Sequence, residues 1–478
     1  MELTQGSLED GISVSMTGGP KVSPAFEGGE DEGASPKQLP KAKRALPALF
    51  ALGIFGHIIF QSFNLVYQNV GESLHMTQEA SLLVSLPGVA LAAVCLFYDT
   101  LCDYVSPRTI VCVGTLVLVA SSVAGFFGAS NFWVVLVCRI FQTIAVHASV
   151  VLVILVKYLP KKDRSIFIGL NNAAYFVSVV LGMLLGGQID FIPWKYILLV
   201  PALSIFLFPL LLKDVPKLEV KPEPFDGLGA TLFTVCVAFL TIFFTYEKTW
   251  LLLVSCLLFA VFAVWMKRSK NPLLTKSMMK SRAFVGTLFI LFLTFFFQYA
   301  AIPIYKTIGK SVYHLNLESI SWLLALVYLI CVAAACFSGS ICKKIGDWPS
   351  ILLSLCLMLL GFLLSAFAIK WGFAAVTVFM IVYEVGLTLV YTPIYDIATS
   401  ALHESQRGRG VGIAHVAMNV SPALGIAVYS AVEKSHVGFE LAPRLSFIFW
   451  LMAALSALSI ICTLGVRKFI GHSVRTPN

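Results

Sequence analysis

The chain has 478 residues, of which 58% are hydrophobic and only 12% are charged, whereas roughly 25% of the residues of a soluble protein are charged. A soluble domain could not bury this much apolar surface, so soluble enzymes and binding modules are excluded. The formal net charge of +9 would suit a nucleic-acid-binding protein. Here, however, Lys and Arg gather in short loops between apolar segments, as membrane topology requires, and no nucleic-acid partner is expected.

Runs of about twenty apolar residues recur along the chain, and a helix needs this length to cross roughly 30 Å of hydrocarbon. Because lipid offers no partner to open backbone groups, these runs have to be helical. The sequence therefore predicts an all-α polytopic membrane protein with fourteen spans. The predicted spans are 47–67, 79–97, 109–129, 132–156, 165–187, 195–212, 227–245, 250–266, 283–303, 319–342, 350–369, 373–395, 410–433 and 446–466.

The connection between the seventh and eighth spans is the short stretch YEKT at 246–249, which predicts a hairpin. Without this hairpin the chain would have twelve spans in the same orientation. The loop 157–164 contains four Lys or Arg residues and the loop 267–282 contains six. Since basic loops stay in the cytoplasm, both termini are expected there, and the plasma membrane is the expected location.

Residues 1–43 are rich in Gly, Ser, Pro and acidic residues and lack apolar periodicity. This composition predicts a disordered cytoplasmic tail. No apolar core stands near the start of the tail, so a cleavable signal peptide is not expected.

The stretch 98–108, YDTLCDYVSPR, places Asp99, Asp103 and Arg108 in the loop predicted between spans two and three. A solvated loop would explain these charges without any function. However, the segment GSICKKIG at 339–346 follows the corresponding span of the later half with matching spacing. Two related halves of this kind are typical of duplicated transporters.

The first loop resembles the G-x-L-x-D-x-x-G-R-[RK] motif of the major facilitator superfamily, with Asp103 and Arg108 at its charged positions. The stretch RIFQT at 139–143 resembles the family's R-x-x-Q-G motif. The stretch GMLLGG at 182–187 resembles G-P-x-x-G-G, a pattern of proton-coupled antiporters. The segment FDGLGATLF at 225–233, with the hairpin after it, resembles the fourteen-span drug:proton antiporters, and tetracycline-efflux proteins in particular.

This resemblance implies the major facilitator fold, in which two pseudo-symmetric six-helix bundles rock around a central cavity. The implied division is an N-terminal bundle at 44–213, a linker with the extra hairpin at 214–282, a C-terminal bundle at 283–467 and a short tail at 468–478. In the family, the charged loop residues, here Asp99, Asp103 and Arg108, latch the bundles in one state. The glycines of the antiporter pattern, here Gly182, Gly186 and Gly187, serve helix packing.

Two charged side chains stand deep inside predicted spans, namely Arg139 and Glu384. A charge at the centre of a bilayer costs roughly 2.5 kcal/mol or more, so each is a candidate functional residue. Glu384 is the candidate proton carrier, because burial disfavours the ionised form of a carboxyl group. The alternative is a structural carboxyl held by the hydroxyl of Tyr383 or Thr388. Arg139 is expected on an anionic substrate group or paired with a carboxylate, and the family resemblance implies a part in the proton pathway; a purely structural ion pair is the alternative.

Uncharged polar residues inside the spans are candidates for lining the substrate cavity, although interhelical hydrogen bonding explains many such residues without a substrate. Those in the first half are His57, Gln61, Asn64, Gln142, His147, Asn171 and Asn172. Those in the second half are Gln298, His415 and Asn419. Isolated histidines do not make a metal site, and neither a metal nor a cofactor is expected.

The sequence thus predicts a secondary active transporter, not an enzyme, that works as a monomer and exports a small amphipathic or drug-like molecule against proton entry. Gln61 and Pro422 stand where the family carries proton-linked acids, which favours an alternative, a uniporter or symporter for a metabolite or nutrient. A second alternative is a receptor or scaffold that does not transport and signals through the tail. The sequence does not identify the substrate.

Overall fold

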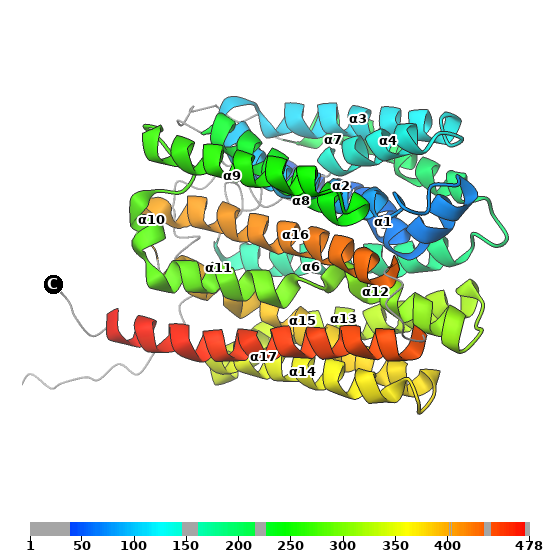
Figure 1. Ribbon diagram of the computed structural model, residues 1–478. Helices are drawn as coiled ribbons and strands as arrows, with labels where there is room; N and C mark the ends of the chain where they lie inside the picture. The colour runs from blue at the N-terminus through cyan, green and yellow to red at the C-terminus, as the bar shows by residue number, and fades with distance from the viewer. Residues whose placement is uncertain are drawn as a thin grey trace, which may run out of the picture.

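The structure is a computed structural model that describes residues 39–145, 161–215, 226–400, 402, 404–434 and 441–473. Within these residues the chain forms helices joined by short turns, and no strand is present there. The helices run roughly parallel to one axis (Figure 1), and α17 (Leu441–Ser473) finishes at one end of the molecule. We call the opposite end, where α1 (Leu39–Ser73) finishes, the distal end.

The chain divides into two groups of helices with a hairpin between them. The N-half consists of α1 (Leu39–Ser73), α2 (Leu82–Tyr104), α3 (Pro107–Phe127), α4 (Phe132–Ile144), α6 (Lys161–Gly187), the 3₁₀ helix η2 (Trp194–Leu207) and α7 (Phe208–Asp214). The middle segment consists of α8 (Gly227–Tyr246), α9 (Thr249–Arg268) and α10 (Lys276–Lys280). The C-half consists of α11 (Arg282–Phe295), α12 (Gln298–Thr307), the π-helix η3 (Ile308–Val312), α13 (Leu317–Ile345), α14 (Asp347–Ala368), α15 (Phe373–Ser400), α16 (Glu404–Lys434) and α17 (Leu441–Ser473).

In the described part of the chain, 11 helices are long and apolar enough to cross a membrane. Three shorter apolar helices, Leu82–Cys95, Phe132–Ile144 and Ala173–Gly187, stand at further predicted spans. Each predicted span overlaps one of these helices, although 146–156 of the fourth span lies outside the described residues. The prediction of an all-helical polytopic membrane protein is confirmed.

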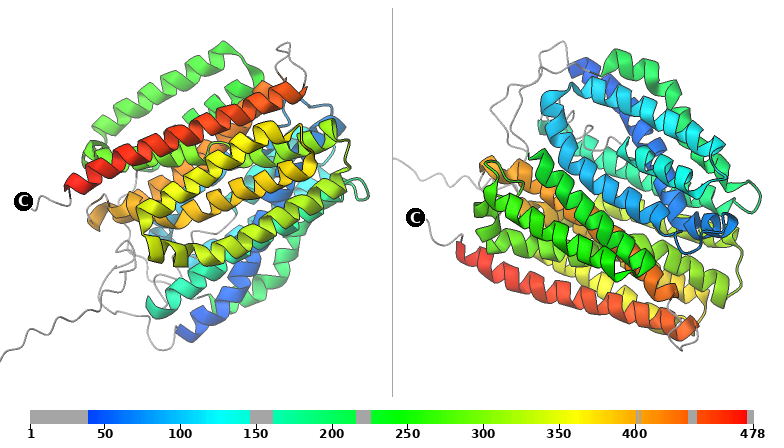
Figure 2. Two further views of the ribbon diagram at one scale, coloured as in Figure 1. Left: turned by 90° about the horizontal axis from the view of Figure 1, so that it is seen from below. Right: turned by 45° about the horizontal axis from the view of Figure 1, so that its top comes forward.

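The two halves meet along a seam made by a few helix pairs. Helix α6 of the N-half packs along α13 of the C-half, α2 packs along α16, and α1 also contacts α12. Figure 2 shows the two groups side by side, and α8 of the hairpin packs against α16. The seam therefore brings together residues that are more than one hundred positions apart in the sequence.

Burial separates the helices of the interior from those that face lipid. We compare the most apolar 18-residue stretch of each helix. The buried share of this stretch is 67% in α1 and 72% in α16, but only 17% in α9. Helix α9 exposes a stripe of apolar side chains that includes Leu253, Leu257 and Val264. Such a stripe would be unfavourable in water, whereas lipid solvates it. The hairpin thus lies at the periphery, and α1 and α16 lie at the seam.

Two predicted loops are helical, and this corrects their placement. Helix α2 continues to Tyr104, so Asp99 and Asp103 lie in its last turns, and only Val105 and Ser106 separate it from α3. In the same way, α13 runs through 339–345 and ends at Gly346, whose φ of +86° suits glycine. The sequence misplaced both because polar residues lower the local hydropathy without breaking the helix.

Candidate functional site

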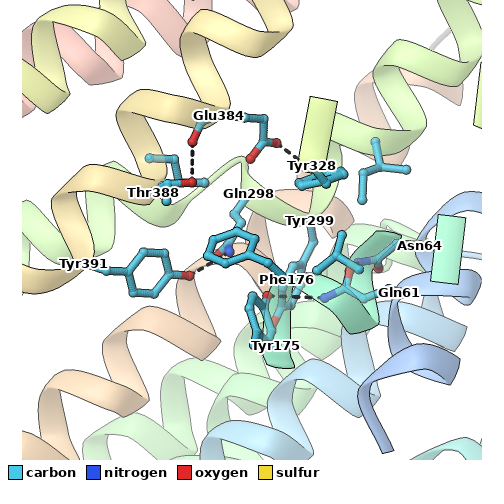
Figure 3. Close-up of a pocket in the computed structure, with 13 residues that line it drawn as sticks. Gln61, Asn64, Tyr175, Phe176, Gln298, Tyr299, Tyr328, Glu384, Thr388 and Tyr391 are labelled. Atoms are coloured by element: carbon cyan, nitrogen blue, oxygen red, sulfur yellow. Dashed lines mark hydrogen bonds between the residues drawn. The ribbon is translucent and has the colours of Figure 1, made fainter. Parts of the chain in front are cut away.

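A cavity opens on the seam, near the middle of the helices that line it (Figure 3). Its empty volume is about 400 Å³, which includes space open to solvent. The N-half contributes Gln61, Asn64, Tyr175, Phe176 and Val179 to its lining. The C-half contributes Gln298, Tyr299, Ile302, Tyr328, Glu384, Leu387, Thr388 and Tyr391. Both halves therefore meet any molecule that occupies it.

Glu384 reaches this cavity from α15 and is 4% exposed. Its Oε1 accepts a hydrogen bond of 2.9 Å from the hydroxyl of Tyr328 on α13. The two hydroxyls named from the sequence behave differently. Thr388 donates to the backbone oxygen of Glu384 at 2.8 Å, and the hydroxyl of Tyr383 has no partner in the described part of the chain. Tyr328 is thus the hydroxyl that holds the carboxyl group.

Two glycines next to Glu384 let α14 and α15 pack closely. A Cβ added to Gly386 would lie 2.7 Å from the backbone oxygen of Ser354, and one added to Gly361 would lie 2.8 Å from the backbone nitrogen of Tyr383. Side chains larger than hydrogen would push these helices apart. The close contact fixes the rotation of α15, which keeps Glu384 on the face that lines the cavity.

Three amides predicted for the cavity do line it, and each is tied to a neighbour (Figure 3). The side-chain nitrogen of Gln61 donates to the hydroxyl of Tyr175 at 3.3 Å, and Asn64 donates to the side-chain oxygen of Gln61 at 3.2 Å. Gln298 donates to the hydroxyl of Tyr391 at 2.9 Å. These bonds orient the amides, which leaves further donors and acceptors to contact a polar ligand.

The predicted packing glycines hold α6 in place. Gly182 lies against α1, where an added Cβ would come within 2.7 Å of the Cβ of Gln61. Gly186 lies against α1 as well, with Ser62 and Leu65 as its neighbours. Gly187 instead faces α13 of the C-half, and its lack of a side chain leaves room for Ser321.

Arg139 lies in α4, is fully buried and is not part of the cavity lining. Its guanidinium stacks 4.4 Å from the ring centre of Phe63 and donates one hydrogen bond of 3.4 Å to the side-chain oxygen of Gln142. Its Nε and Nη2 have no partner among the described residues. The structure therefore places Arg139 and Gln142 inside the N-half rather than beside Glu384.

His57, His415, Asn419 and Asn171 do not belong to the cavity lining. His57 is one turn from Gln61, and its ring meets the edge of Tyr175 with 5.4 Å between ring centres. Asn419 accepts a bond of 3.4 Å from Tyr299 and donates to the backbone oxygen of His415 at 2.8 Å. Asn171 is partly buried on α6.

Some predicted residues cannot be placed in full. His147 lies outside the described residues, and the side chains of Asp99, Asp103 and Asn172 are not described. Arg108 is partly buried in the first turn of α3. Among the described residues no group of three His, Cys, Asp or Glu side chains could hold a metal ion.

The sequence prediction missed the aromatic part of the site. Tyr175, Tyr299, Tyr328 and Tyr391 all line the cavity, and each hydroxyl bonds to a polar side chain. Tyrosine is common in apolar spans, so its presence alone gave no signal. The useful signal was helical spacing, because Tyr391 lies seven residues, or two turns, after Glu384 on the same face of α15.

Two bundles of helices around a cavity on their common seam define a membrane transporter of the major facilitator type. The family profile of the Major Facilitator Superfamily matches residues 49–273 and 287–475, and the chain belongs to this family.

Two bacterial multidrug resistance proteins are similar to the chain in sequence. The chain is 26% identical over 301 residues to multidrug resistance protein Stp of Mycobacterium tuberculosis, covering 59% of this chain and 55% of that protein. It is 24% identical over 293 residues to multidrug resistance protein 3 of Bacillus subtilis, covering 57% and 56%. The chain thus matches little more than half of the length of each relative.

The solved structures show the same fold at low identity. A D-xylose–proton symporter gives a TM-score of 0.62 at 14% identity, covering 87% of this chain and 96% of that one. The human organic anion transporter MFSD10 gives a TM-score of 0.58 at 15% identity, covering 88% and 99%. The expectation of the major facilitator fold is confirmed.

Proposed function

We propose that the chain is a secondary active transporter that exports a small amphipathic or drug-like molecule in exchange for protons. The observation that carries this proposal is the burial of Glu384 in the cavity between the halves. Alternating access is typical of the family, and the names of the two bacterial relatives support drug-like substrates.

The coupling follows from the cost of a buried charge. An ionised carboxyl group away from water needs a compensating partner, and in the cavity that partner is either a proton or a positively charged or donating group of the substrate. Proton and substrate therefore exclude each other at Glu384. The hydroxyl of Tyr328 stabilises the carboxylate while neither is bound.

The aromatic lining suits a substrate with an apolar body. The rings of Tyr175, Phe176, Tyr299 and Tyr391 offer apolar faces, which also attract organic cations. The amides of Gln61, Asn64 and Gln298 supply hydrogen bonds without adding charge. A mixed lining of this kind accepts amphipathic molecules of different shapes.

We propose that the chain lies in the plasma membrane, and its basic loops support an orientation with both termini in the cytoplasm. The distal end then faces outward. Asp99, Asp103 and Arg108 lie at the junction of α2 and α3, at the other end of the molecule, and we assign them to a latch between the halves there. For Arg139 a part in proton coupling stays a prediction, and its contacts support a packing role.

The test is transport of ethidium by proteoliposomes under an imposed pH gradient. We expect Glu384→Gln to abolish gradient-driven transport, because the amide cannot take up a proton. Glu247→Gln is the matched control, since Glu247 is exposed in the hairpin turn, and it should transport like the unsubstituted protein. Full gradient-driven transport by Glu384→Gln would remove Glu384 from the coupling.

A metabolite uniporter or symporter is the second candidate, and the neutral amides of the cavity favour it. The same proteoliposomes distinguish it when a panel of sugars and amino acids replaces ethidium. Uptake of a panel member with the proton gradient would assign symport. Exchange that is independent of the gradient and unchanged in Glu384→Gln would assign uniport.

A further inference from the structure

Two charged residues of the C-half stand at the seam between the cavity and the distal end. Lys306 on α12 is 2% exposed, and Glu433 is partly buried in the last turn of α16. Lys306 follows Ile302, which lines the cavity, by one helical turn. Neither residue belongs to the cavity lining. Their position makes them the next layer of the seam beyond the cavity.

Two adjacent amide side chains of α1, in the N-half, form hydrogen bonds with these two charged groups. The ammonium group of Lys306 donates to the side-chain oxygen of Asn69 at 2.5 Å. The side-chain nitrogen of Gln68 donates to both carboxylate oxygens of Glu433, at 3.2 and 3.0 Å. Consecutive residues point in directions about 100° apart around a helix axis. One turn of α1 can therefore contact α12 and α16 at the same time.

Within the C-half the two helices are tied together at the same level. The hydroxyl of Thr307, the residue after Lys306, donates to Oε1 of Glu433 at 3.1 Å. The hydroxyls of Thr307 and Tyr429 are 3.2 Å apart. Thr307 is 9% exposed and Tyr429 1% exposed. The acid is thus anchored to its own half as well as to α1.

We propose that Lys306 and Glu433, held by Asn69 and Gln68, form a distal gate that closes the cavity on this side and opens in each transport cycle. Both charges belong to the C-half, and their partners on α1 are neutral. Separating the halves therefore breaks these charge-assisted hydrogen bonds to α1. Both charges can then be solvated or can interact with each other within the C-half.

The surrounding charges agree with this arrangement. Glu433, Glu72 and Asp190 attract Lys306, and Lys310 repels it. Glu72, Asp190 and Lys310 are exposed, so water and salt screen their effect. The buried contacts with α1 are screened much less. The gate needs only the alternating access that is typical of the family, so it stands apart from the substrate and from proton coupling.

The test measures access to the cavity from the distal side. A cysteine introduced by Ile302→Cys is labelled with a membrane-impermeant maleimide, and the labelling of the native cysteines is subtracted with the parent protein. A second reporter, Thr77→Cys, lies exposed in the turn between α1 and α2 and shows which membrane face is distal. The assay uses vesicles in which this second reporter is reached from the bath.

Two variants should move the gate in opposite directions, which a loss of folding cannot do. Lys306→Met removes a contact to α1, and we expect the reporter at position 302 to label at least threefold faster. Asn69→Asp creates an ion pair between the halves, and labelling should become slower than in the parent. Lys310→Met is the matched control, because Lys310 is exposed on the same helical segment, and it should leave the rate unchanged.

The double variant completes the test. In Lys306→Met, the added Asn69→Asp should no longer slow labelling, because the carboxylate has lost its cation. The proposal is overturned if Lys306→Met does not speed labelling, or if Asn69→Asp slows it equally with and without Lys306. Failure of Glu384→Gln to affect transport would leave these rates unaffected, so the two proposals fail separately.

Discussion

Along the seam, the C-half presents the charged side chains of Lys306, Glu384 and Glu433, whereas α1 of the N-half presents neutral amides. The buried charge of Arg139 lies inside the N-half, against Phe63 and away from the cavity. Two bundles with related folds therefore carry different chemistry where they meet. Because the hydrogen-bond partners of Lys306 and Glu433 on α1 are neutral, opening the seam there breaks hydrogen bonds that water can replace.

The largest expected difference between the two halves concerns two tyrosines that line the cavity from opposite sides. Tyr328 donates to the carboxylate of Glu384, whereas Tyr175 accepts from the neutral amide of Gln61. A hydrogen bond to a charged group contributes about 1.5–3 kcal/mol and a neutral one about 0.5–1.5 kcal/mol. We expect Tyr328→Phe to lower gradient-driven ethidium transport by about tenfold or more, and Tyr175→Phe by about threefold. Equal effects of the two would contradict the asymmetry.

The contact of α6 with α13 gives the next largest effect. Gly187→Ala places a methyl group where Ser321 lies, so the halves should close poorly at the distal end, and transport should fall several-fold. Adding Ser321→Gly should restore most of the rate, because it returns the lost space. The control is Gly53→Ala, since an added Cβ there has no neighbour within 4 Å. A failure of the double variant to recover would place the defect elsewhere.

The sequence predicted some of the residues on which these predictions depend and missed others. Hydropathy alone located the 11 described helices that are long and apolar enough to cross a membrane, because the length of an apolar run is fixed by the thickness of the bilayer. It also singled out Glu384, since a lone acid in an apolar run is conspicuous. Tyr328 stayed hidden because tyrosine is ordinary in a membrane helix, and only packing shows which neighbour its hydroxyl meets.

The sequence also predicted poorly what happens at the ends of the spans. Lys306 lies three residues beyond the predicted span 283–303, but the helical segment continues through Val312. Glu433 is the last residue of the predicted span 410–433, where a charge normally reaches water. Hydropathy cannot tell a charge at a helix end that meets solvent from one that a second bundle covers. Only the tertiary contacts with Gln68 and Asn69 make this distinction.

Arg139→Met tests the role of the charge that is buried inside the N-half, away from the seam. Methionine keeps much of the apolar contact with Phe63, and two of the guanidinium nitrogens have no partner to lose among the described residues. We expect a two- to threefold lower ethidium transport rate, because the one hydrogen bond lost, to Gln142, is long at 3.4 Å and therefore weak, with an unchanged pH profile. A shifted profile would instead place Arg139 in the proton pathway.

The smallest effect on transport is expected at the peripheral hairpin. Asp226 begins α8 and accepts hydrogen bonds from the backbone of Gly229 at 2.9 Å, the indole of Trp265 at 2.8 Å and the backbone of Leu273 at 3.0 Å. Asp226→Asn should lower the melting temperature by a few degrees, since one buried donor loses its acceptor at about 1–3 kcal/mol. The rate of transport should change less than twofold. Glu247→Gln, in the exposed turn of the same hairpin, should change neither quantity.

The central claim is that the carboxyl group of Glu384 takes up and releases the transported proton. Infrared difference spectroscopy on the purified protein measures this directly, through the C=O stretch of a protonated carboxylic acid as ethidium is added. We predict that ethidium removes one such band in the unsubstituted protein and that this change is absent in Glu384→Gln. The same band change in both proteins would contradict the account, because another group would then carry the proton.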